Sequence, residues 1–344
     1  MSPALLRPDP APHHHGAPVP PDATPERIVQ KLIDGATLRL TGTWGQGRAC
    51  LERLDAALPP QSAPFAARQA ALERRSERAG RLFAPIEAHR VALEHAPDVG
   101  FLSELYPDHG AFSLALPDAI DLSRAWNRYR DGVPFPVLGH VLRPFYGVYA
   151  PNRSEHLELF ATWLATTDVA RGSAVDVGTG TGVLALLLAR AGFEQVHATD
   201  LNPNAIESLR REVRRHPASI TSEVADLLGA APAPIDLVVF NPPWLPGPVR
   251  GPLDQALHYE PSLFTRFFDA SHERLAQGGR VAIIFSNIGE LVRPDAPHPI
   301  RQELLRGRFR QVSLARRRIR PMVEDGAPKR RTKERVEVWE LARA

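Results

Sequence analysis

From residue 153 to the C-terminus, short apolar segments alternate with amphipathic segments, and this alternation limits the possible folds more than any other sequence feature. Apolar runs of strand length bounded by turn residues predict buried strands, and the segments between them have helical spacing. The predicted strands are 173–177, 195–199, 219–225, 235–240, 280–286, 311–319 and 334–342. The predicted helices are 154–166, 182–191, 203–215, 261–276 and 299–307. Such alternation predicts a doubly wound α/β fold, in which helices cover both faces of a parallel sheet.

The last two predicted strands have a different connection. Residues 320–333 join them and are rich in proline, glycine and charge, with no helical pattern. Because parallel strands need a long crossover, usually a helix, we expect these two strands to form an antiparallel pair at one edge. The sequence therefore predicts a seven-stranded, mostly parallel sheet.

The N-terminal part of the chain lacks this alternation, and a length of 344 residues is typical of two domains. Residues 1–23 are rich in proline and polar residues, so we expect a disordered tail. Residues 24–145 are expected to form a mainly helical domain that acts on the substrate or as a lid. Its predicted elements are helices at 24–35 and 48–58, one or two helices within 65–96, and a short strand within 36–45. The Pro- and Gly-rich segment 134–151 predicts the connection into a second domain, residues 146–344.

Positive charge is concentrated near the C-terminus. Residues 301–344 contain 14 Lys and Arg but 6 Asp and Glu, whereas the whole chain has a formal net charge of +3. Seven of these 14 residues form a basic patch: Arg316, Arg317, Arg318, Arg320, Lys329, Arg330 and Arg331. This basic patch is compatible with a polyanionic partner. A solvated, arginine-rich surface explains the same residues equally well.

Several classes of protein do not fit the sequence. No apolar run reaches the roughly 18–20 residues of a membrane helix, and the N-terminus lacks the basic start and apolar core of a signal peptide. The single cysteine, Cys50, permits neither an internal disulfide nor a cysteine-based metal site. We therefore expect a cytoplasmic protein without a membrane partner and without a metal.

A glycine-rich loop is the most specific motif. Residues 175–183 read VDVGTGTGV and lead from a predicted strand into a predicted helix. Gly178, Gly180 and Gly182 permit a tight turn and bring bare backbone against a ligand, and the helix that follows offers unpaired N–H groups. In the dinucleotide fingerprint the third glycine comes one residue later, where this chain has Val183. The spacing favours a ligand without a pyrophosphate over a nicotinamide dinucleotide, although an oxidoreductase shares the same fold class.

Two carboxylates follow the next predicted strands. Asp200 ends the second strand, where an acidic side chain can accept both hydroxyl groups of a ribose. Asp226 follows the third strand and, with Leu227 beside it, can bind the amine and the face of an adenine. Either aspartate can instead cap a helix. The upstream glycine loop favours ligand binding for Asp200, and the two interpretations of Asp226 are evenly balanced.

The fourth strand ends in the sequence Asn-Pro-Pro-Trp, residues 241–244. Two consecutive prolines remove two donors and stiffen the loop, so the Asn241 side-chain oxygen and the Pro242 carbonyl can point at one spot. Two such acceptors can bind the two N–H bonds of a planar amino group. Trp244 adds a flat face for stacking on the target group. A simple proline-rich turn would not require this combination.

These motifs resemble class I S-adenosylmethionine-dependent methyltransferases of the Asn-Pro-Pro-aromatic group, which includes release-factor glutamine methyltransferases and RNA and DNA amino-methyltransferases. The resemblance covers about residues 147–344. It implies that Asp176 and the loop residues Gly178, Thr179, Gly180 and Gly182 contact the methionine part of S-adenosylmethionine. It further implies that Asp200 and Leu201 contact the ribose and that Asp226 and Leu227 contact the adenine. Asn241, Pro242 and Trp244 are implied to bind the target nitrogen, and Asn241 is also expected to contact the cofactor. The sequence departs from the glutamine-methylating members at Leu263–Phe268, where it reads LFTRFF.

Candidate acceptor-side residues flank these motifs. Tyr149, Asn152 and Arg153 precede the domain in a segment that often closes over cofactor and substrate in the family, although these residues can equally pack two domains together. Pro243 lies within the signature and His258 follows it.

The expected function is transfer of a methyl group from S-adenosylmethionine to a planar nitrogen of a macromolecule, either a protein glutamine or an RNA base. A small-molecule N-methyltransferase is the alternative. Alignment and desolvation of the nitrogen are expected to supply most of the rate, and no general base is assigned.

Overall fold

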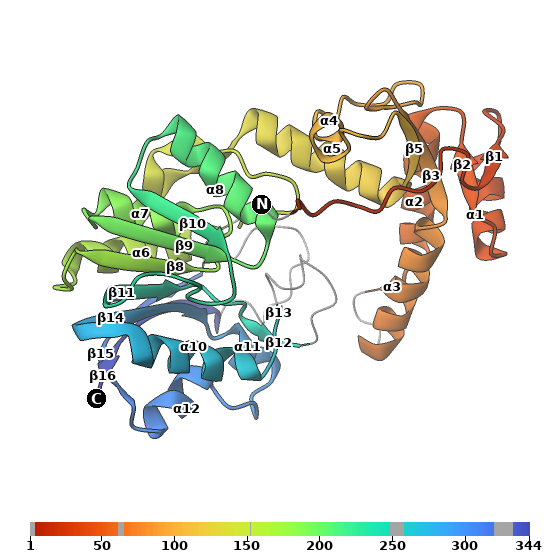
Figure 1. The fold of residues 1–344 in the computed structure, drawn as a ribbon. Helices are drawn as coiled ribbons and strands as arrows, with labels where there is room; N and C mark the ends of the chain where they lie inside the picture. Colours follow the sequence, from red (N-terminus) through yellow and green to blue (C-terminus); the bar gives the residue numbers. More distant parts are fainter. Residues whose placement is uncertain (1–3, 61–64, 152, 248–257, 320–332) are drawn as a thin grey trace. The chain divides into compact units, whose positions relative to one another are not determined.

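The computed structural model describes residues 4–344 apart from 61–64, 152, 248–257 and 320–332. The chain forms two compact units (Figure 1). The N-terminal unit is Arg7–Arg130, and the C-terminal unit is Asp131–Ala344 together with the start of the chain up to Leu6.

The C-terminal unit contains a seven-stranded sheet in the order β10-β9-β8-β11-β14-β16-β15. Its strands are β8 (Ser173–Val177), β9 (Gln195–Asp200), β10 (Ile220–Val224), β11 (Ile235–Phe240), β14 (Leu275–Ser286), β15 (Phe309–Arg318) and β16 (Arg335–Arg343). Neighbours from β10 to β14 pair in parallel, whereas β16 is antiparallel to both β14 and β15. The predicted doubly wound, mostly parallel sheet with an antiparallel pair at one edge is therefore confirmed.

Helices cover both faces of this sheet because successive strand residues point to opposite sides. The helices are α6 (Glu155–Thr166), α7 (Val183–Arg190), α8 (Pro203–Arg215), α10 (Ser262–Arg274), α11 (Ile288–Val292) and α12 (Pro299–Leu305). Leu237 and Val239 of β11 are buried with residues of α6, α7 and α8. Val238 and Phe240 are buried on the opposite face with residues of α10. The loops that follow the carboxyl ends of β8, β9, β10 and β11 meet at one edge of the sheet.

The segment before α6 belongs to the C-terminal unit. It contains β6 (Val133–Phe135), a 3₁₀ helix η1 (Pro136–Leu138) and β7 (His140–Leu142), and the two strands pair with each other. Phe135, Leu138 and Leu142 are buried in the same cluster as residues of α6 and α7. This packing places the boundary between the units at residues 130 and 131 rather than at the expected 145 and 146.

The N-terminal unit contains a five-stranded sheet, of which the sequence predicts only one short strand. Its strands are β1 (Ala17–Val19), β2 (Leu38–Leu40), β3 (Leu82–Glu87), β4 (Arg90–Val91) and β5 (Ala111–Ala115). Its helices are α1 (Pro25–Ile33), α2 (Trp44–Ala56), α3 (Phe65–Ala79), α4 (Phe101–Leu105) and α5 (Leu116–Asp131). Leu82, Ala84 and Ile86 are fully buried at the period of two that a strand requires, and this pattern competes with the helical spacing seen in the sequence.

The structure also corrects the expected disordered tail at residues 1–23. β1 pairs in parallel with β2, and the backbone of Ala11 exchanges hydrogen bonds with that of Ser113. Val19 is buried, and Tyr106 donates a hydrogen bond to the carbonyl of Pro8. A proline-rich segment can join a sheet in this way at its edge, where few backbone donors are needed.

Within the described part of the chain, no helix is both long enough and apolar enough to cross a membrane. The same residues contain no group of three or more His, Cys, Asp or Glu side chains placed to bind a metal ion.

Candidate active site

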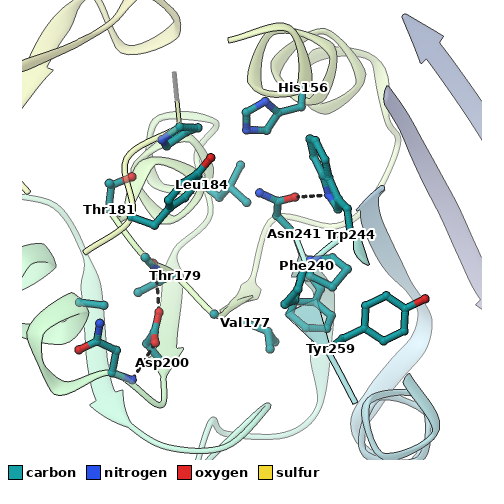
Figure 2. Close-up of a pocket in the computed structure, with 18 of the residues that line it drawn as sticks. His156, Val177, Thr179, Thr181, Leu184, Asp200, Phe240, Asn241, Trp244 and Tyr259 are labelled. Carbon is teal, nitrogen blue, oxygen red and sulfur yellow. Dashed lines mark hydrogen bonds between the residues drawn. The ribbon is translucent and has the colours of Figure 1, made fainter. Parts of the chain in front are cut away.

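A cavity of about 650 Å³ lies at the carboxyl edge of the sheet in the C-terminal unit. Loops that follow β8, β9, β10 and β11 line it, as parallel strands require when their carboxyl ends meet at one edge (Figure 2). The expected residues that line it are Tyr149, Arg153, Gly178, Thr179, Gly180, Asp200, Leu201, Asp226, Leu227, Asn241, Pro242, Pro243, Trp244 and His258. Asp176 and Gly182 do not line it, although both support the loop that does.

The glycine loop is fixed by backbone contacts. Gly178 and Gly180 have φ values of 65° and 54°, in the left-handed region that glycine adopts without steric cost. The N–H of Thr179 donates to the carbonyl of Thr199 at 2.9 Å, which ties the loop to β9. The loop therefore presents bare backbone to the cavity, as the sequence predicts for a ligand-binding turn.

Asp176 lies beneath the loop and is fully buried. Its Oδ2 accepts hydrogen bonds from the Thr179 hydroxyl at 2.6 Å and the Ala185 N–H at 3.0 Å, whereas Oδ1 has no partner among the described residues. Burial raises the pKa of this carboxyl to about 7, and the two hydrogen bonds oppose the rise. Its position indicates that Asp176 orients the loop through Oδ2, and that its buried Oδ1 is available for a further hydrogen bond.

Gly182 serves packing as well as the turn. It is the residue before α7 and has a φ of 83°. A Cβ atom at this position would lie 2.6 Å from Cδ1 of Leu209 on α8. The third glycine thus allows α7 and α8 to approach closely, which the sequence spacing alone does not reveal.

Asp200 is held in place at the end of β9. Its Oδ2 accepts from the Gly180 N–H and its Oδ1 from the Asn202 N–H, both at 2.8 Å. Burial raises the pKa of the carboxyl, and these two hydrogen bonds lower it. Each oxygen keeps a second lone pair, so the carboxylate can still accept two hydroxyl groups from a ligand in the cavity.

Asp226 has a more open setting. Its carboxylate forms an ion pair with Arg266 of α10, and both side chains are about half exposed, at 46% and 47%. The neighbouring Leu227 has a φ of 50°, and its carbonyl accepts a hydrogen bond from the Thr199 hydroxyl. Because Arg266 also lines the cavity, an adenine amine would compete with its guanidinium for this carboxylate.

The Asn-Pro-Pro-Trp loop follows β11, the neighbour of β8. Trp244 donates its indole N–H to Oδ1 of Asn241 at 3.2 Å (Figure 2). This bond turns the indole beside the asparagine and uses one of the two lone pairs of the oxygen. Asn241 and the carbonyl of Pro242 therefore remain able to accept hydrogen bonds, with Trp244 fixed next to them.

Two residues at this end of the cavity have no cue in the sequence. His156 of α6 is 4% exposed, and its ring lies 5.6 Å from that of Trp244 at an interplanar angle of 90°. Burial lowers the pKa of His156 to about 4, so the ring is neutral at pH 7. Glu334, directly before β16, is 5% exposed and lines the same cavity. In the sequence, His156 lies inside a predicted helix and Glu334 at the start of a predicted strand, and neither belongs to a motif that distinguishes a functional residue from a structural one.

The remaining acceptor-side candidates line the cavity from other segments. Tyr149 is 45% exposed. Nδ1 of His258 is buried without a partner in the described residues. His258 lies in β13 (His258–Tyr259), which pairs with β12 (Leu245–Pro246) directly after Trp244. Asn152 lies outside the described residues.

The basic patch is partly neutralised. Arg316 lies 3.0 Å from Glu337, and Arg317 forms an ion pair with Glu158. Four further members, Arg320, Lys329, Arg330 and Arg331, lie outside the described residues. Arginines that are already paired with carboxylates contribute less to the attraction of a polyanion.

Comparison with known proteins identifies the domain. Residues 147–297 match the family model of the methyltransferase small domain. This part of the chain is similar to that family. The expectation of a class I methyltransferase domain, with S-adenosylmethionine as its cofactor, is confirmed for this part of the chain.

Two sequence relatives and one solved structure show how far the similarity extends. The release factor glutamine methyltransferase of Deinococcus radiodurans is 38% identical over 90 residues, which are 26% of this chain and 32% of that protein. A protein of Methanocaldococcus jannaschii, provisionally named a protein N5-glutamine methyltransferase, is 25% identical over 128 residues, or 35% of this chain and 65% of that one. The ribosomal protein L11 methylase of Lactobacillus delbrueckii subsp. bulgaricus has a TM-score of 0.40 and 17% identity, covering 57% of this chain and 81% of that one. The chain thus spans less than two thirds of the length of the two sequence relatives.

Proposed function

We propose that the protein is an S-adenosylmethionine-dependent N-methyltransferase that acts on a planar amide or amine nitrogen of a macromolecule. One observation carries this proposal. The glycine loop anchored by Asp200 and the Asn-Pro-Pro-Trp loop leave neighbouring strands, β8 and β11, and line the same cavity. A cofactor held by the first loop would therefore lie next to an acceptor held by the second.

The residues of the cavity fit S-adenosylmethionine. The loop at residues 178–180 offers two glycines and the backbone of Thr179, whose hydroxyl is bound to Asp176, for the methionine part. The fixed carboxylate of Asp200 suits the two ribose hydroxyls. Leu201 and Leu227 offer apolar contacts for the nucleoside, and Asp226 can accept from the adenine amine once Arg266 releases it. We propose these residues as the cofactor-binding set, with Asp176 and Gly182 as its support.

The chemistry of the acceptor site follows from its hydrogen-bond acceptors. S-adenosylmethionine supplies, when bound, a methyl group on a positively charged sulfur that leaves as a neutral thioether. Asn241 and Pro242 would accept the two N–H bonds of the acceptor and align its lone pair with the methyl carbon. Trp244, with Pro243 beside it, would pack on the acceptor group and exclude water from the nitrogen.

For the acceptor, we place a protein glutamine first and an RNA base second. The names of the two sequence relatives support an amide acceptor. The pairing of Arg316 and Arg317 with glutamates weakens the argument for a polyanion. A small-molecule acceptor is a second candidate, because His156 and Glu334, which line the cavity, are almost fully buried.

The test is incubation of the protein and methyl-labelled cofactor with fractionated cell extract. Label in protein supports the first acceptor class, and label in RNA or in small molecules supports the others. Methylation of an RNA should also weaken steeply between low and moderate salt. Label in no fraction would contradict the proposal.

The variant Asn241→Ala separates binding of the cofactor from transfer of the methyl group. We expect it to retain cofactor binding by calorimetry and to lose turnover, because the asparagine touches the acceptor and not the cofactor loop. Loss of cofactor binding and turnover together would indicate a structural role for the loop instead.

A further inference from the structure

His156 lies in the cavity beside Trp244 of the Asn-Pro-Pro-Trp loop. The residue belongs to the first turn of α6, and its side chain faces Asn241 and Trp244 across the cavity (Figure 2). Its ring packs edge-to-face against the indole of Trp244, whose N–H is bound to Asn241. Three side chains from two separate segments therefore surround one small space.

The ring nitrogens of His156 are available for hydrogen bonds to a ligand. The side chain is 4% exposed, and no hydrogen bond joins either ring nitrogen to a residue in the part of the chain that the structure describes. A buried polar group without a partner is costly unless a ligand or a water satisfies it. Burial also lowers the pKa of the ring to about 4, so at neutral pH one nitrogen is a free acceptor.

We propose that His156 completes the acceptor site: its unprotonated ring nitrogen shares one of the two acceptor N–H groups with Asn241 and takes up that proton when the nitrogen is methylated. This inference rests on the proposed function. It assigns a proton acceptor to a reaction for which the sequence offers none.

The step balances in atoms and electrons. The lone pair of the acceptor nitrogen forms the new bond to the methyl carbon, and the electron pair of the broken carbon–sulfur bond stays on the sulfur. The N–H proton then passes to the ring of His156, and from the imidazolium to solvent. A weakly basic ring suffices, because the nitrogen of a methylated, still protonated amide is a strong acid.

Two variants separate the roles of the ring. His156→Phe keeps an aromatic ring against Trp244 and removes the acceptor, whereas His156→Gln keeps a polar acceptor and removes the ring. Binding of S-adenosylhomocysteine, measured by calorimetry, is the control for folding, and we expect both variants to bind within about twofold of the wild type. In single-turnover labelling of the extract fraction that accepts methyl groups, His156→Phe should be about a hundredfold slower. His156→Gln should recover part of that loss.

A spectroscopic readout is independent of turnover. The protein with ¹⁵N-labelled histidine and bound S-adenosylhomocysteine is titrated with propionamide, a simple primary amide. The unprotonated ring nitrogen of His156 should shift in the direction of an accepted hydrogen bond, and Asn241→Ala should weaken the response. Equal single-turnover rates for wild type and His156→Phe, or no shift of this nitrogen with propionamide, would overturn the inference. If the wild type binds no S-adenosylhomocysteine and labels no fraction, the proposed function itself fails.

Discussion

Gly182→Ala tests whether the third glycine of the loop is required by its contact with α8. The substitution adds a Cβ atom 2.6 Å from Cδ1 of Leu209, in a backbone with a φ of 83°. The left-handed conformation costs an alanine about 1 kcal/mol. Overpacking against a buried leucine costs about 1–3 kcal/mol more. We therefore expect a loss of about 2–4 kcal/mol in the free energy of unfolding.

Gly192→Ala is the matched control, because Gly192 follows the other end of α7. Its φ is 89°, and a Cβ atom there would meet nothing within 4 Å. This variant carries the conformational cost without the clash, so we expect a loss of about 1 kcal/mol. A comparison of the two variants isolates the contact with Leu209.

Differential scanning calorimetry measures both variants, with the transition of the C-terminal unit identified by its shift on adding S-adenosylhomocysteine. At about 2–4 °C per kcal/mol for a unit of this size, Gly182→Ala should lower the midpoint by about 5–15 °C and Gly192→Ala by about 2–4 °C. Adding Leu209→Ala to Gly182→Ala should give a smaller loss than the sum of the single losses. Equal shifts for the two glycine variants would refute the packing argument.

Three further predictions concern individual side chains. Burial raises the pKa of Asp176 to about 7, so between about pH 4 and pH 7 the carboxyl is protonated in the folded protein and ionised in the unfolded protein. The wild type therefore loses stability as the pH rises through this range, and Asp176→Asn should become more stable relative to it, with no further change above about pH 7. A pH-independent difference in thermal midpoint would contradict this. Asp200→Asn should weaken S-adenosylhomocysteine binding about tenfold or more in calorimetry and Asp226→Asn about threefold or less, since Asp226 is half exposed and paired with Arg266; the reverse order would refute the assignment. Cys50 is fully buried, with its thiol pKa raised by burial to about 11, so alkylation should be slow in the native protein and fast in denaturant, and fast native labelling would disprove the burial.

The C-terminal unit could be predicted largely from local patterns. The predicted strands 173–177 and 235–240 and the predicted helix 203–215 coincide with β8, β11 and α8. In these segments the apolar residues have a single period, and the rule that ligands bind at the carboxyl ends of parallel strands then brings the motifs together. The N-terminal unit is harder to predict from the sequence, because the spacing of Leu82 and Ile86 is compatible with a helix as well as with the strand β3 to which they belong.

The details of the site depend on contacts between residues distant in sequence. Arg266 of α10 forms an ion pair with Asp226, and Leu209 of α8 leaves no room for a side chain at Gly182. His156 becomes a candidate only once α6 is packed beside Trp244. Sequence patterns identify the loops that form the cavity, but they do not identify which side chains already have partners.

Isothermal titration of the wild-type protein with S-adenosylhomocysteine and, separately, with a reduced nicotinamide dinucleotide tests the central claim most directly. The account predicts binding of the demethylated cofactor at one site per chain and no measurable heat from the dinucleotide. Binding of the dinucleotide without binding of S-adenosylhomocysteine would contradict it.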